Sequence, residues 1–259
     1  MKSKFEVKKL NIFFSLLAVA AMIAAWVVAY YSVRNDYVVP SFPDALQEVW
    51  VQLCSAEFWA AFGNTLGRSL AAWLLAFVLA VAFAALSAAS GPFRRFFAPF
   101  ISVMRTVPTM AITLMLLIWT KPAVAPVIVA FMMIFPLTYA QLIAAYEGID
   151  PQITEMAAIY KVSLRDRLFR VLIPMMLPDV LSQAGANFSL TLKVMISAEV
   201  LASTFRSVGG LIHTAAVELA TARMFALVLL MLLFGGLLEF AFGKLRLVTR
   251  RWSGAKGRR

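Results

Sequence analysis

Six long stretches of mainly apolar residues dominate the sequence, and a helix of roughly 20 residues is enough to cross about 30 Å of membrane hydrocarbon. The composition agrees, with 62% apolar and 14% charged residues, where soluble domains have about 45–50% and about 25%. We therefore expect an all-α membrane protein whose residues 10–243 form one six-helix transmembrane domain. The predicted spans are residues 10–33, 70–89, 100–120, 122–146, 184–203 and 224–242.

The first stretch follows a basic segment, residues 1–9, and so begins like a secretory signal peptide. Its apolar run exceeds twenty residues, whereas signal peptides have about 7–15, and Tyr30 and Tyr31 do not fit a small-residue cleavage site. We interpret this stretch as a retained transmembrane helix.

Basic residues predict the orientation, because Lys and Arg concentrate in the cytoplasmic loops of membrane proteins. Most of the 24 Lys and Arg fall at residues 1–9, 94–95, 161–170 and 244–259. These segments share one side if both termini are cytoplasmic. The net charge of +11 is then explained by this bias and a basic cytoplasmic tail, residues 244–259, so we expect no nucleic-acid partner.

Several other functional classes are disfavoured by the sequence. The chain has one cysteine, Cys54, and one histidine, His213, which leaves no ligand set for a disulfide framework or a multi-His metal site. A membrane enzyme would need a convergent catalytic constellation, which is missing. An ion-coupled secondary transporter remains the alternative function, although no internal repeat typical of that class is visible.

One longer hydrophilic loop, residues 147–183, separates the fourth and fifth predicted spans on the cytoplasmic side. Asp150 followed by Pro151 is typical of a helix start. Ser163 with Asp166 three residues later predicts a second helix start, and Pro174 and Pro178 are expected to break or bend the chain before the fifth span. Two short helices at the membrane surface could be a coupling element or merely an interfacial hairpin.

The same loop carries a family resemblance. The pattern Glu155-Met-Ala157, three residues, Lys161, nine residues, Val171-Leu-Ile-Pro174 resembles the EAA loop of ABC-importer permease subunits. Flanking motifs agree in order, namely Thr65-Leu-Gly-Arg68-Ser, Arg105-Thr-Val-Pro108, Phe135-Pro136, Ala198-Glu199 and Gly209-Gly210. Over about residues 38–252 the chain resembles permeases of nitrate, taurine and aliphatic-sulfonate importers. It departs at Lys161, where the family has glycine.

The resemblance implies a type I permease bundle in a bacterial inner membrane, with two copies forming a homodimer. A separate ABC ATPase would bind ATP and Mg, so this chain would carry no cofactor, and it has no phosphate-binding P-loop motif. An extracytoplasmic solute-binding protein would deliver the cargo. The residues expected to contact the ATPase are Glu155, Ala157, Ala158, Tyr160, Lys161, Ser163, Leu164, Arg165, Asp166, Arg167 and Pro174.

Polar residues within the spans are candidates for the translocation path. Gln183, Asn187 and Thr191 recur every four residues and therefore share one helix face, while Arg105 and Glu199 are ionisable groups in predicted spans. Hydrogen bonds or ion pairs between helices are the competing interpretation for all five. The cargo stays open among nitrate, sulfonates, taurine and vitamin precursors.

Overall fold

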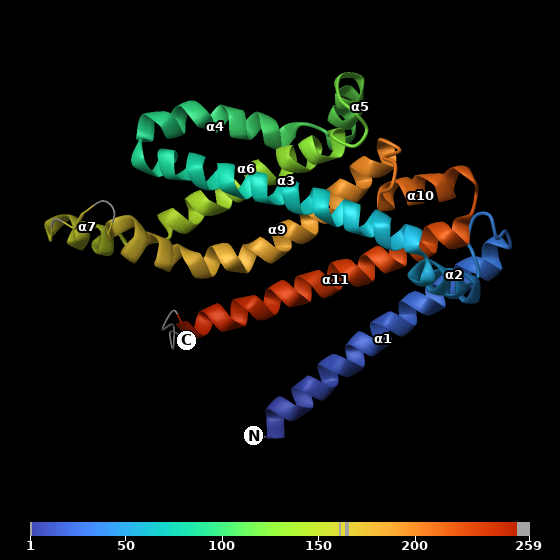
Figure 1. Cartoon of the computed structure of the whole chain (residues 1–259). Helices are drawn as coiled ribbons and strands as arrows, with labels where there is room; N and C mark the ends of the chain where they lie inside the picture. The colour runs from blue at the N-terminus through green and yellow to red at the C-terminus, as the bar shows by residue number, and fades with distance from the viewer. Residues whose placement is uncertain (1, 161, 164–165, 253–259) are drawn as a thin grey trace.

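The computed structural model describes residues 2–160, 162–163 and 166–252, and every element assigned in this part of the chain is helical. The long helices form one elongated bundle (Figure 1). The start of α1, the end of α11 and the short helix α7 lie toward one end, and α2 and α10 lie toward the other. The elements are α1 (Lys2–Val33), α2 (Phe42–Cys54), α3 (Ala56–Ala89), α4 (Gly91–Thr106), α5 (Thr109–Trp119), α6 (Ala125–Glu147), α7 (Pro151–Ile159), η1 (Arg167–Leu172), α9 (Ile173–Leu201), α10 (Val208–Val217) and α11 (Thr221–Trp252).

The core of the bundle is formed by α3, α6 and α9. On α3, Ala76, Ala80 and Ala84 follow one another every four residues and are buried against Ile134 and Phe135 of α6. Small side chains at this spacing let two helix backbones approach closely, which is the usual packing of helices in membranes.

The helices of the second and third predicted spans differ from the expected straight segments. The helix of the second span, α3, begins at Ala56, well before the predicted residue 70, because its first turns are amphipathic rather than uniformly apolar. The third span is not one straight helix, since α4 and α5 meet at an angle of 95°. The break lies at Val107 and Pro108, both extended, because a proline disfavours helical geometry in the residue before it.

The number of spans is not settled by helix length and apolarity. Within the described residues, α3, α6 and the Thr221–Phe242 part of α11 are each long and apolar enough to cross a membrane, and the bent α4–α5 pair would be a fourth. The apolar part of α1, Leu17–Val33, is shorter. The six-span architecture therefore stays a prediction.

The chain after α7 is more helical than predicted. The Ser163 hydroxyl accepts the Asp166 backbone N–H at 3.2 Å and thus begins a new helix. This helix runs through the π-helical turn η1 directly into α9, so α9 begins at Ile173 instead of residue 184. Pro174 lies at the start of α9, directly after the π-helical turn. The chain stays helical through this residue, so of the predicted break or bend the structure shows no break there.

The helix α1 stands apart from the bundle (Figure 1). Its main attachment is Trp26, whose indole N–H donates to the Pro40 carbonyl at 3.1 Å and whose rings contact Phe42 and Phe225. Most other described side chains of α1 are exposed in the single chain. An apolar helix with so few contacts needs lipid or another protein around it.

Candidate functional site

The predicted coupling loop lies at one end of the bundle, with α7 projecting beyond the long helices (Figure 1). The helix begins where predicted, because the Asp150 carboxylate accepts the Gln152 N–H at 2.9 Å. Glu155 is exposed, and Ile159 and Tyr160 are 75% and 76% exposed. The protruding tip thus presents large apolar side chains beside an acidic one.

The turn after α7 is held by short-range polar contacts. The Ser163 hydroxyl donates to the Asp166 carboxylate at 2.8 Å, and Asp166 also pairs with Arg170 at 3.1 Å. Arg167 is half-buried at the start of η1. The structure says nothing of Lys161, Leu164 and Arg165, which lie outside the described residues, nor of the side chains of Ala157 and Ala158.

Glu199 lies near the other end of the bundle and is fully buried. One carboxylate oxygen, Oε1, accepts Arg68 Nη1 at 2.9 Å, and the other, Oε2, accepts the Thr65 hydroxyl at 2.8 Å. The backbone N–H of Gly209 also donates to Oε2, at 3.4 Å. The carboxylate is therefore bonded within the chain, which favours the structural alternative over direct contact with cargo.

The glycines next to Glu199 allow this close approach. A Cβ on Gly209 would lie 2.3 Å from the Glu199 Cβ and 2.7 Å from the Ile196 carbonyl oxygen. A Cβ on Gly210 would lie 2.1 Å from the Thr204 carbonyl oxygen. Only glycine fits at either position without movement of backbone atoms.

This network joins the motif Thr65-Leu-Gly-Arg68 to two motifs that lie more than 120 residues later in the sequence, Ala198-Glu199 and Gly209-Gly210. The Thr65 hydroxyl additionally accepts the Val208 N–H at 3.0 Å, at the start of α10. Sequence reasoning missed Arg68 as the partner of Glu199, although a basic and an acidic residue at the same end of two neighbouring spans were a visible signal. The result is a polar connection between α3, α9 and α10.

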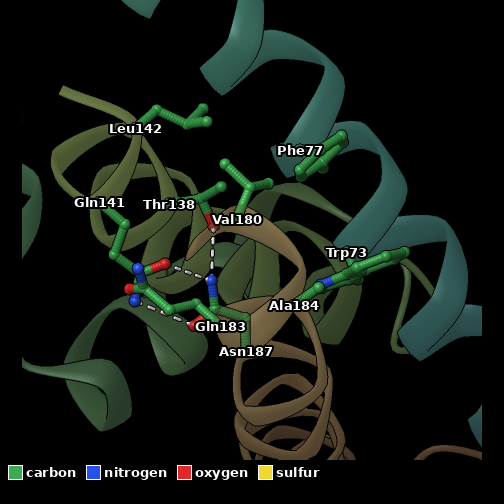
Figure 2. Close-up of a pocket in the computed structure, with 9 residues that line it drawn as sticks. All are labelled: Trp73, Phe77, Thr138, Gln141, Leu142, Val180, Gln183, Ala184 and Asn187. Carbon is green, nitrogen blue, oxygen red and sulfur yellow. Dashed lines mark hydrogen bonds between the residues drawn. The ribbon is translucent and has the colours of Figure 1, made fainter. Parts of the chain in front are cut away.

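A second polar cluster lies deeper, where α6 and α9 contact each other (Figure 2). The side-chain amides of Asn187 and Gln141 bond each other reciprocally at 2.6 and 3.2 Å, and the Asn187 amide also donates to the Thr138 hydroxyl at 3.3 Å. Gln183 and Trp73 line the same small pocket. The sequence-predicted pair Gln183 and Asn187 is thus brought together on one pocket wall.

The remaining predicted path residues are placed differently. Thr191 is fully buried, and its hydroxyl donates to the Asn187 carbonyl of its own helix at 2.7 Å. Arg105 is exposed in the last turn of α4. A role in the translocation path stays a prediction for Arg105, Gln183, Asn187, Thr191 and Glu199.

Comparison with known families shows which kind of protein has this architecture. Residues 74–246 match the family of binding-protein-dependent transport system inner membrane components. The match spans well over half of the chain, so this protein belongs to that family and is an ABC-transporter permease subunit rather than an enzyme. A search of curated protein sequences finds no match.

Solved structures support the fold. The chain is similar to a chain of an amino acid ABC transporter crystallised with histidines, at a TM-score of 0.62 and 19% identity, over 75% of this chain and 94% of that one. It also resembles two inward-facing forms of the MetNI methionine ABC transporter, both at a TM-score of 0.63. Identities there are 14% and 15%, over 72% and 81% of this chain and 93% and 99% of those chains.

Proposed function

We propose that the chain is the transmembrane subunit of an ATP-driven importer and that residues 147–183 couple it to a separate ATPase. Two copies would enclose a path for a small solute of the nitrate, sulfonate, taurine or vitamin-precursor class. A binding protein would deliver the solute to the outer face. Family membership supports the permease role, and the lack of a P-loop motif in the sequence agrees with ATP binding elsewhere.

The observation that carries the coupling proposal is the helical continuity from Asp166 into α9. From Asp166 the chain stays helical through η1 into α9. A force applied at Asp166, three residues after the capping Ser163, would therefore reach α9 along one helical segment. Such a rigid element with two positions is what a ligand-driven switch requires, and ATP-dependent movement of the ATPases would supply the bias.

The exposed tip of α7 suits a protein partner. Met156, Ile159 and Tyr160 are all more than half exposed at an end of the chain that basic residues predict to be cytoplasmic. Clustered exposed apolar side chains rimmed by charge commonly mark protein-binding surfaces. Glu155, exposed on the same helix, would add an ionic contact with the ATPase.

A homodimer would explain why most described side chains of α1 are exposed in the single chain. These side chains have little contact with their own chain, and a second copy offers an apolar surface at the same membrane depth. Orientation with both termini in the cytoplasm places α2 and α10 outside, where a solute-binding protein would dock.

Co-purification tests the proposal against the alternative of an ion-coupled carrier. Expressed with a candidate ABC ATPase, the detergent-solubilised chain should bring that ATPase down, and Glu155→Lys should abolish the association because it reverses the charge at the contact. Asp36→Lys, an exposed acid in the predicted outer turn, is the matched control and should bind normally. A chain that never retains an ATPase, yet transports solute down an ion gradient, would be a secondary carrier.

A further inference from the structure

The helix α9 has two different faces. Asn187, Thr191 and Glu199 lie on the side that is buried against α3, α6 and α10. The opposite side is exposed in the single chain, and its residues follow one another at intervals of three or four. They are Ala186, Leu190, Lys193, Ser197 and Leu201.

Lys193 is the charged member of this exposed stripe. It lies eight residues before the end of α9 at Leu201, which at 1.5 Å per residue is about 12 Å from the outer end of the helix. That depth is near the middle of a bilayer core about 30 Å thick. An ammonium group there is costly in lipid, so such residues face protein or water-filled cavities.

Lys193 has no acidic partner at its own depth. Within the described residues its side chain forms no ion pair, and Glu199 is already bonded to Arg68 and Thr65. Asp179 lies about 21 Å further inward on the same helix. Glu239 lies about 27 Å from the outer start of α11, hence about 15 Å deeper than Lys193. A second copy of the chain would offer the same acids at the same depths.

Arg105 is a second exposed cation within the predicted spans. It lies in the last turn of α4, directly before the break at Val107 and Pro108. Its side chain is also exposed and makes no ion pair among the described residues. Each chain therefore carries, within its predicted spans, two exposed cations that form no ion pair among the described residues.

We propose that Lys193, together with Arg105, forms a cationic site in the translocation path that selects an anionic solute carrying a carboxylate, sulfonate or nitrate-like group. The counter-charge missing from the protein is supplied by the cargo as it passes. The inference rests on the proposed permease function and adds a substrate class and a residue, Lys193, that lies on the opposite face of α9 from the amide cluster.

The test uses a reporter cysteine one turn from Lys193. Cys54 is the chain's only cysteine, so Ser197→Cys in a Cys54→Ser background gives a single thiol on the exposed stripe. The full transporter, with its ATPase, is treated with two water-soluble methanethiosulfonates, one bearing a sulfonate and one a trimethylammonium group. The labelling rate of each reagent is divided by the rate at which the same reagent reacts with a small thiol free in solution. This ratio corrects for the different intrinsic reactivities of the two reagents.

The proposal predicts that the thiol is labelled and that the normalised rate is several-fold higher for the sulfonate reagent. Lys193→Gln should reduce this ratio several-fold, Lys193→Arg should preserve it, and Arg105→Gln should reduce it partly. Thr191→Cys, on the buried face of the same helix, is the control that should stay unlabelled.

An unlabelled thiol at position 197, or a ratio that Lys193→Gln does not change, would overturn the cationic site. The proposed permease function would survive that result if the ATPase still co-purifies. Loss of the ATPase with normal charge-selective labelling would instead contradict the coupling proposal and leave the site in place.

Discussion

At the residue scale, the stability of the chain is expected to depend strongly on the ion pair between Glu199 and Arg68. A fully buried carboxylate without its partner is an uncompensated charge, and removing one member of such a pair typically costs about 3–5 kcal/mol. Arg68→Ala should therefore lower the thermal stability of the detergent-purified chain markedly.

The matched control is Arg95→Ala, because Arg95 is exposed and forms no ion pair within the described residues. A double-mutant cycle with Glu199→Gln isolates the pairwise energy. Additive effects of the two changes would show that the two side chains do not interact.

Gly209 gives a second residue-scale prediction. The methyl group of Gly209→Ala would overlap the Glu199 side chain and the α9 backbone. We therefore expect the free energy of unfolding to fall by about 1–3 kcal/mol, the usual cost of overpacking. Loss of monodispersity on size-exclusion chromatography with rising temperature measures it.

Gly63→Ala is the corresponding control on α3, where an added Cβ meets nothing within 4 Å. That change should stabilise slightly, by up to about 1 kcal/mol, because alanine favours helix more than glycine does. An equal loss of stability in both variants would show that the close approach of α9 to Gly209 is not the reason why glycine is needed there.

At the scale of elements, the capped turn after α7 should matter more for coupling than for folding. Ser163→Ala removes the hydroxyl that accepts the Asp166 N–H and should cost about 1 kcal/mol locally. We expect normal membrane insertion but weaker stimulation of ATP hydrolysis by loaded binding protein in proteoliposomes.

Ser163→Asp, which can still cap the helix, should restore the stimulation. Ser182→Ala, which removes an exposed hydroxyl bonded to the Asp179 carbonyl on α9, should have no effect. Full stimulation in Ser163→Ala would show that the transmission does not depend on this cap.

Helix ends were predictable where a local signal sets them. Asp150 and Ser163 both cap helices as their sequence patterns indicated. The continuity through Pro174 was not predictable, because sequence does not show whether a proline ends a helix, bends it or is accommodated beside a π-helical turn. The bend at Pro108 was hidden for the same reason, since whether a proline bends a helix depends on its packing.

The candidate site was predictable only in part, for a physical reason. Spacing shows which residues share a helix face, and Gln183 and Asn187 do line one pocket. It does not show which face is turned inward, because that depends on neighbouring helices. Thr191 is fully buried within the single chain and Lys193 lies on the exposed side, a difference that spacing alone does not reveal.

At the scale of the whole molecule, orientation decides between the functional schemes. Basic residues predict that α7 is cytoplasmic and that α2 is outside, and these two helices lie toward opposite ends of the bundle (Figure 1). The native thiol of Cys54, exposed at the end of α2, marks one side. A thiol at Tyr160, exposed just after α7, would mark the other.

The side of the membrane from which each of these two thiols reacts is the most direct test of whether residues 147–183 can contact a cytoplasmic ATPase. Tyr160→Cys in the Cys54→Ser background should react with a membrane-impermeant maleimide in inside-out vesicles and not in intact spheroplasts, and the native chain with Cys54 should show the reverse. Labelling of the thiol at position 160 from outside the cell would place the loop where no ATPase can reach it and would contradict the account.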